Sequence, residues 1–252
     1  MSAWYEETFG RDYLTLYPHR NDDEAHRDVA DIIRLIDPPR DQPLLDLCCG
    51  AGRHLVAFWK AGFRDLTGLD LSEDLLAEAR SRLEAESTSG IHLVCADMRD
   101  IPATEAYHTI VSLFTSFGYF ATDQEDTEVL CSAHQALIAG GTFLMDTLNR
   151  HSIIANLVQQ EEKHVGGKRI SVRRHVTRDG CRVEKDTLIR TKGEPETMYH
   201  ESVRMYKKQE LEGMLLAAGF STPRFYGALD GRPYAEDSPR MVVAATKERK
   251  GP

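Results

Sequence analysis

The feature that most constrains the fold is a short apolar run that ends in a glycine turn. The run Leu44–Leu47 contains one acid, Asp46, and the chain then passes through Gly50 and Gly52 directly into an amphipathic pattern. This order predicts a strand, a tight turn and the start of a helix. Glycines let the backbone adopt positive φ and let a ligand approach the main chain, and a helix start offers unpaired N–H groups. The stretch therefore predicts a ligand-binding turn.

Strand-like runs alternate with helical patterns along most of the chain. After the predicted helix Arg53–Lys60, which ends at Gly62, the expected strands are Leu66–Asp70, Ile91–Ala96, Thr109–Phe114, Thr142–Asp146, Arg224–Gly227 and Met241–Thr246. This alternation predicts an α/β fold with a doubly wound, mostly parallel sheet. Ligands bind such sheets at the carboxyl ends of the strands, where Asp70, Asp97 and Phe114 fall.

Two segments break the alternation. Residues 4–36 hold two helical patterns, and the aromatic residues of the first, from Trp4 to Tyr17, fit either core packing or a helical lid in which His19 and Arg20 face a charged ligand. Between residues 151 and 206 the chain predicts strands without helices, which indicates a small antiparallel insert. The expected organisation is a helical cap (1–37), an α/β core (38–150), an antiparallel insert that roofs the site (151–206) and the end of the core (207–252).

Within the insert, the expected strands are Arg169–Thr177, Arg182–Thr191 and Tyr199–Tyr206. Turn residues separate them, at Asp179-Gly180 and at Gly193-Glu194-Pro195. The helix near Asp126–Ile138 and the helix near Gln209–Ala218 belong to the core on either side of the insert.

Charge and hydropathy narrow the class of partner. The chain carries 31 Lys and Arg residues against 40 Asp and Glu residues, a formal charge of −9, which disfavours a nucleic-acid partner. It holds no run of about 18 apolar residues and no basic, apolar leader, so we expect a cytosolic protein without a membrane partner. The sequence gives no signal for an oligomeric state.

Five cysteines form no C-x-x-C pair, so we expect reduced thiols in the core. Cys48 and Cys49 lie beside the glycine turn, and a reactive or metal-binding pair is the alternative. Adjacent strand residues point to opposite faces, which disfavours that alternative. We expect no metal.

The acids around the turn select the ligand. The dinucleotide pattern G-x-G-x-x-G requires a third glycine where this chain has Leu55, and the chain has no G-x-x-x-x-G-K-[ST] phosphate loop. A matching ligand has a diol for Asp70, an amino or amide donor for Asp97, a cationic amine near the turn, and no phosphates.

These motifs resemble those of the class I S-adenosylmethionine (SAM)-dependent methyltransferases. Asp46–Gly52, Gly68–Ser72 and Ala96–Met98 are similar to motif I, the acid after it, and motif II, in order and spacing. More narrowly, Trp4-Tyr5, Tyr17-x-His19-Arg20, Phe114–Phe120 and Ser238–Arg240 resemble a widespread bacterial group of such enzymes, and more distantly amino-sugar N,N-dimethyltransferases.

The resemblance implies a Rossmann-like, seven-stranded sheet and SAM as cofactor. It also implies that Asp70 holds the ribose hydroxyls, that Asp97 and Met98 contact the adenine, and that Gly50 lies at the methionine end. The cofactor-binding residues expected on this basis are Tyr17, Arg20, Asp46, Cys48, Gly50, Gly52, Asp70, Leu71, Asp97, Met98 and Phe114. Cys48 stands where the family has its first glycine, so the backbone could approach the ligand less closely there.

The expected reaction is methyl transfer to N or O of a small molecule by in-line displacement, in which alignment supplies most of the acceleration. His19 and Tyr119 are the named catalytic candidates, and His175 and His200 are further possible bases. Leu113-Phe114-Thr115-Ser116 lacks the Asn/Asp-Pro-Pro-Tyr/Phe motif of enzymes that methylate amide or base nitrogens. The alternatives are an RNA or protein methyltransferase, and a SAM-binding protein without methyl transfer, such as an aminopropyl transferase or a sensor.

Overall fold

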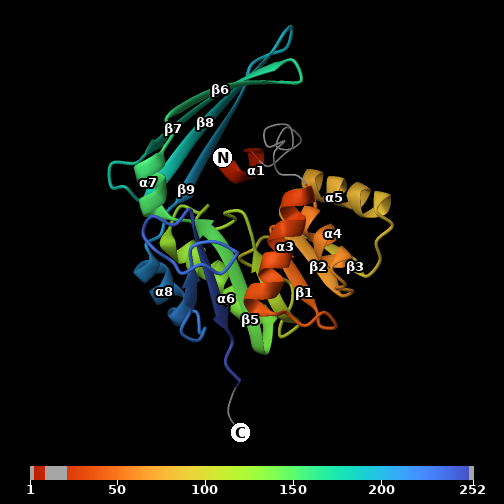
Figure 1. The fold of residues 1–252 in the computed structure, drawn as a ribbon. Helices are drawn as coiled ribbons and strands as arrows, with labels where there is room; N and C mark the ends of the chain where they lie inside the picture. Colours follow the sequence, from red (N-terminus) through yellow and green to blue (C-terminus); the bar gives the residue numbers. More distant parts are fainter. Residues whose placement is uncertain (1–2, 9–21, 250–252) are drawn as a thin grey trace.

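The computed structural model describes residues 3–8 and 22–249, with the side chain of Glu7 left out. Its central sheet has seven strands in the order β10-β11-β5-β4-β1-β2-β3 (Figure 1). β1 to β5 run parallel, whereas β11 is antiparallel to β5 and β10 is antiparallel to β11. The strands are β1 (Leu44–Leu47), β2 (Leu66–Asp70), β3 (Ile91–Cys95), β4 (Tyr107–Ser112), β5 (Leu137–Leu148), β10 (Arg224–Tyr226) and β11 (Arg240–Thr246). The prediction of a mostly parallel α/β sheet is confirmed.

The helices of the described residues are α1 (Trp4–Thr8), α3 (Asp22–Ile36), α4 (Arg53–Lys60), α5 (Glu73–Ala85), α6 (Asp123–Ala136), α7 (Arg150–Asn156) and α8 (Lys208–Ala217). Of these, α3, α4, α5, α6 and α8 cover the faces of the central sheet, whereas α1 and α7 lie outside it (Figure 1). Local sequence sets their starts. The Ser72 hydroxyl accepts a hydrogen bond from the Leu75 N–H at the start of α5, and Thr122 and Glu125 form a capping box at the start of α6.

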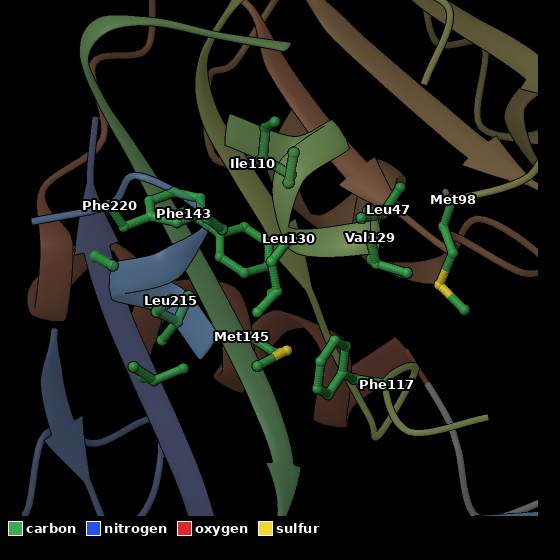
Figure 2. Packing of buried hydrophobic residues seen from close by; sticks show 14 of the residues in the cluster. Leu47, Met98, Ile110, Phe117, Val129, Leu130, Phe143, Met145, Leu215 and Phe220 are labelled. Atoms are coloured by element: carbon green, nitrogen blue, oxygen red, sulfur yellow. The ribbon is translucent and has the colours of Figure 1, made fainter. Parts of the chain in front are cut away.

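The central strands are buried on both faces, and alternate residues along them belong to two separate hydrophobic clusters. Leu45, Leu47 and Ile110 belong to one cluster, whereas Leu44 and Val111 belong to the other. Figure 2 shows the first cluster, where Phe143 and Met145 of β5 pack with Leu130 of α6 and with Leu215 and Phe220. Helices on both faces explain why these strands read as continuous apolar runs instead of alternating ones.

A second sheet of four antiparallel strands, which we call the roof sheet, stands apart from the central sheet (Figure 1). Its strands are β6 (Gln160–Val165), β7 (Lys168–Val176), β8 (Arg182–Thr191) and β9 (Thr197–Arg204). The prediction of an antiparallel insert is confirmed, but β6 and the helix α7 were not foreseen. The turn between β6 and β7 is Gly166-Gly167, with both residues at positive φ. β6 has a charged sequence that gives no apolar alternation.

Several boundaries differ from those that the sequence predicts. β4 ends at Ser112 instead of Phe114, because Phe114 (φ 60°) and Thr115 (φ 64°) adopt left-handed backbone conformations that no strand contains. α6 begins at Asp123 because of its capping box, and β5 extends from Leu137 to Leu148.

The five cysteines are free thiols, but the prediction that they all lie in the core is wrong. Cys49 is buried, whereas Cys95 and Cys131 are exposed. Cys95 is the last residue of the edge strand β3, and the residues around it on that strand are only partly covered. Among residues 3–8 and 22–249, no helix is both long and apolar enough to cross a membrane.

Candidate cofactor and active site

A cavity of about 660 Å³ opens at the carboxyl ends of the central parallel strands, a size typical of small-molecule sites. Most of the predicted site residues that the structure describes line it: Asp46, Cys48, Gly50, Asp70, Leu71, Asp97, Met98, Phe114 and Tyr119. Strands that are distant in sequence but adjacent in the sheet bring these residues together. The cavity therefore lies where the order of strands predicts a ligand.

Asp70 connects the two turns that border the cavity. Its Oδ2 accepts a hydrogen bond from the Gly50 N–H at 2.8 Å, and its Oδ1 accepts one from the Ser72 N–H at 2.9 Å. Gly50 has φ 53°, and an added Cβ there would meet no atom within 4 Å, so the backbone is open to a ligand. The carboxylate retains further lone pairs for a donor in the cavity.

Gly52 does not line the cavity. Its φ is 74°, and an added Cβ would lie 3.1 Å from Cβ of Ala79 in α5. This glycine permits the close approach of α4 to α5, which is a packing role. Its predicted contact with the cofactor stays a prediction.

Cys48 adopts φ 65° at the position of the missing glycine. Its Sγ donates a weak hydrogen bond to Sδ of Met98 at 3.5 Å. Burial raises the pKa of the Cys48 thiol well above its ordinary value, so the side chain is a neutral part of the wall. Among the described residues, no three His, Cys, Asp or Glu side chains gather closely enough to hold a metal ion.

Asp97 is fixed by the residue two places further along the chain. The Arg99 backbone N–H and guanidinium both donate to it, with Nη2 at 2.6 Å from Oδ2. Burial acts to raise the pKa of Asp97, but the hydrogen bonds from Arg99 outweigh it and lower the pKa. Arg99 also lies 4.2 Å from the centre of the Phe120 ring and pairs with Glu125. The carboxylate is thus ionised and held in place as an acceptor.

Two buried polar atoms in the cavity region lack a hydrogen-bond partner within the described part of the chain. They are Oδ2 of Asp46 and Nη2 of Arg53, and both residues line the cavity. The remainder of the Arg53 guanidinium is held, with Nη1 2.8 Å from Oε2 of Glu24 and the Phe114 ring centre at 4.2 Å. Buried polar atoms are nearly always paired, so this acceptor and this donor fit a ligand that carries opposite charges close together.

Comparisons with known proteins match the α/β core, and some of them extend over almost the whole chain. A family model described as a methyltransferase domain matches residues 44–141. The dTDP-3-amino-3,4,6-trideoxy-alpha-D-glucopyranose N,N-dimethyltransferase of Streptomyces venezuelae is 30% identical over 240 residues, covering 90% of this chain and 96% of that protein. This chain belongs to the SAM-dependent methyltransferases.

Two further relatives differ in how much of the chain they match. The SAM-bound amino pentose methyltransferase CalS10 of Micromonospora echinaspora is 25% identical with a TM-score of 0.67, covering 94% of this chain and 97% of that one. A tRNA U34 carboxymethyltransferase of Shewanella baltica is 27% identical over 115 residues, which is 45% of this chain and 33% of that protein.

The cavity of this methyltransferase fits SAM, which supplies an electrophilic methyl group on a sulfonium. Asp70 would accept hydrogen bonds from the ribose diol, and Asp97 would accept one from the adenine amino group. The two unpaired atoms fit the amino-acid end, because Asp46 would pair with the ammonium and Arg53 with the carboxylate of a zwitterion. Arg53 was not foreseen from the sequence. Its place in the first turn of the helix after the glycine turn is the signal that could have identified it.

Other predicted residues lie elsewhere. Tyr17, His19 and Arg20 fall outside the described residues, so their roles stay predictions. His175 and His200 are on the roof sheet, do not line the cavity, and pair with Glu184 and Asp186 respectively.

The α1 helix packs against the cavity, next to a loop that follows β4. Trp4 Nε1 donates to the Tyr119 carbonyl at 3.2 Å, and the Tyr5 and Phe120 ring centres are 5.4 Å apart. Tyr5 and Glu6 line the cavity. For residues 4–8, the aromatic side chains therefore both pack against the protein and cover the site.

Asp46 leads to a prediction about the pH dependence of cofactor binding. Burial raises its pKa to about 6, so the carboxyl binds a proton below that pH, and the carboxylate that pairs with an ammonium forms above it. We expect the affinity for S-adenosylhomocysteine (SAH) to rise about tenfold between pH 5 and pH 7, measured by calorimetry. In Asp46→Asn, this rise should vanish and the affinity at pH 7 should be lower. An unchanged pH profile in Asp46→Asn would assign the titration to another group.

Proposed function

We propose that this enzyme methylates the nitrogen of an amino sugar carried on a nucleotide. The supporting observation is the extent of similarity to the Streptomyces venezuelae dimethyltransferase, which covers 90% of this chain and so extends well beyond residues 44–141. The tRNA-modifying relative matches 45% of the chain. The match to the sugar-modifying relative includes the segments outside residues 44–141, whereas the match to the tRNA-modifying relative is much shorter. The longer match therefore favours a small-molecule acceptor.

The acceptor lies between the roof sheet, α1 and the loop after β4. α1 is tied to the roof sheet, because the Thr8 hydroxyl donates to the His200 carbonyl of β9 at 3.2 Å. The same helix contacts Tyr119 through Trp4, whose ring centre is 5.1 Å from that of Tyr119. Enclosure of this kind excludes water and aligns an acceptor with the methyl group.

Amine methylation requires a neutral nitrogen whose lone pair points along the breaking bond between sulfur and carbon. Tyr119 lines the cavity, and its ring contacts that of Trp4 in α1. We assign its hydroxyl the role of accepting an N–H hydrogen bond from the acceptor, which orients the lone pair. The product ammonium then releases its proton to solvent.

The experiment is to incubate the enzyme with SAM and dTDP-3-amino-3,4,6-trideoxy-α-D-glucopyranose, the amino sugar of the relative's name, and to follow SAH release and product mass. We expect the mass to rise by one or two methyl groups. The counterpart with a hydroxyl in place of the amine should be unchanged. Tyr119→Phe should lower kcat about tenfold and leave the SAH dissociation constant within twofold.

Three results would contradict the proposal. Methylation of the hydroxyl counterpart at a similar rate would move the acceptor from nitrogen to oxygen. Methyl transfer to tRNA, with none to a panel of nucleotide-linked amino sugars, would favour the RNA alternative. SAH binding without transfer to either would indicate a sensor.

A further inference from the structure

The loop after β4 forms one wall of the cavity and has no regular secondary structure. This wall loop, residues 113–122, contributes Leu113, Phe114, Ser116, Tyr119 and Phe120 to the lining. Gly118 within it has φ 90°. A segment with left-handed residues and no ladder of backbone hydrogen bonds depends on contacts from elsewhere in the fold to hold one conformation.

The end of the roof sheet where β8 begins and β9 ends, which we call its base, supplies such contacts at Gly118. Its carbonyl accepts hydrogen bonds from the Arg204 backbone N–H at 2.7 Å and from Arg182 Nη2 at 3.4 Å. A Cβ added to Gly118 would lie 2.5 Å from the Arg204 carbonyl oxygen, so the two backbones are in direct contact. The two arginines come from β8 and from the end of β9.

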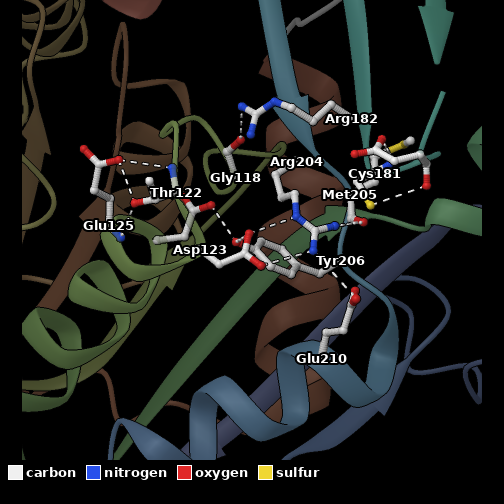
Figure 3. A network of polar contacts seen from close by, with 12 residues as sticks. Gly118, Thr122, Asp123, Glu125, Cys181, Arg182, Arg204, Met205, Tyr206 and Glu210 are labelled. Carbon is white, nitrogen blue, oxygen red and sulfur yellow. Dashed lines mark hydrogen bonds and ion pairs between the residues drawn. The ribbon is translucent and has the colours of Figure 1, made fainter. Parts of the chain in front are cut away.

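A second set of contacts joins the same strand end to the start of α6, as Figure 3 shows. The Tyr206 hydroxyl lies 2.7 Å from Oδ2 of Asp126 and 3.0 Å from Oδ1 of Asp123. Arg204 also donates to Asp123, with Nε 2.9 Å from Oδ1. Asp126 is fully buried, and Tyr206 is 2% exposed. The Tyr206 ring centre is 5.5 Å from that of Phe117, in the wall loop.

The two ends of the wall loop are also held by hydrogen bonds. Asp146 of β5 accepts the Phe114 N–H at 3.3 Å through Oδ2, and its carbonyl accepts the Thr115 N–H at 3.0 Å. The capping box holds Thr122 at the other end. Tyr119 and Phe120 lie between these two ends. The Tyr119 carbonyl accepts the Trp4 Nε1 hydrogen bond from α1, and the neighbouring Gly118 carbonyl accepts those from the roof sheet.

We infer that Arg182, Tyr206 and Asp126 are positioning residues of the methyltransferase site, which hold Tyr119 and Phe120 at the cavity by fixing the wall loop to the base of the roof sheet. They do not line the cavity, so they act through the loop. This inference rests on the cofactor cavity and does not require that the acceptor be an amine.

The test compares Arg182→Gln and Tyr206→Phe with Arg190→Gln. Arg190 lies on the same strand, β8, and pairs with the exposed Glu196 away from the wall loop, so it is a matched control. The readouts are amide hydrogen exchange by mass spectrometry and the SAH dissociation constant. We expect the amides of residues 117–122 to exchange about tenfold faster in the first two variants, and SAH to bind roughly fivefold more weakly. Arg190→Gln should change neither.

Two features separate positioning from general destabilisation. Exchange in β1 and β5 should stay as in the wild type, whereas a variant that merely unfolds more easily would exchange faster there as well. Asp126→Asn retains an acceptor for the Tyr206 hydroxyl and should keep the wild-type exchange of the wall loop. Unchanged exchange and SAH affinity in Arg182→Gln and Tyr206→Phe, or equal increases in β1, would overturn the inference. Failure of the wild type to bind SAH would instead reject the cofactor site.

Discussion

Asp70→Ala is expected to reduce SAH affinity at least a hundredfold. The substitution removes the acceptor of the Gly50 N–H and of the Ser72 N–H, and with them the contact between the two turns that border the cavity. It also removes the carboxylate that we assign to the ribose diol. Hydrogen bonds to a charged group contribute about 1.5–3 kcal/mol each, so the loss of two exceeds a hundredfold in affinity. Isothermal titration calorimetry measures the change directly.

The matched control for this prediction is Asp65→Ala. Asp65 precedes the same strand, β2, at the opposite edge of the sheet, and its side chain is exposed. Its loss should leave SAH affinity within twofold. Normal SAH binding by Asp70→Ala would reject the assignment of the cavity to the cofactor, since no other described residue connects both turns through one carboxylate.

Arg53→Gln is expected to separate two ligands that share the adenosine and sulfur. SAH carries an amino-acid end, whereas 5′-methylthioadenosine lacks it. Nη2 of Arg53 has no partner within the described part of the chain, so a ligand carboxylate would gain a hydrogen bond to a buried cation. We expect the dissociation constant of SAH to rise roughly thirtyfold, while that of 5′-methylthioadenosine changes less than twofold.

Glu24→Gln is the companion variant for Arg53. It removes the charged partner of Nη1 and leaves the guanidinium in place, so SAH affinity should fall by much less than in Arg53→Gln. If Arg53→Gln weakened both ligands equally, the residue would support the cavity wall through Phe114 and would not contact the amino-acid end.

The order of strands and the chemistry of the strand ends follow from local sequence. The apolar run that contains Asp46 and the runs that lead into Asp70 and Asp97 predict parallel strands, and parallel strands place their carboxyl ends at one edge of the sheet. Ser72 caps its helix by equally local chemistry, since the hydroxyl and the Leu75 N–H that donates to it are only three residues apart. Such short-range chemistry needs no knowledge of the remainder of the fold.

The contacts of the wall loop and of Arg53 could not be predicted from local sequence. Phe114 and Thr115 are not residue types that favour a left-handed backbone, and tertiary contacts with Asp146 accompany their conformation. β6 gave no apolar pattern, because a sheet that stands apart from the core does not require one.

For the glycine turn itself, the sequence determined the turn, its acid and the class of ligand, because backbone freedom at Gly50 and the charge of the neighbouring acids are properties of single residues. Only the tertiary structure decided that Gly52 packs against α5, that Cys48 faces Met98, and that Arg53 lies near Asp46 with an atom unpaired. Those facts depend on which elements approach each other in space. Long-range packing between helices and strands sets that approach, and the residue types along the chain do not encode it locally.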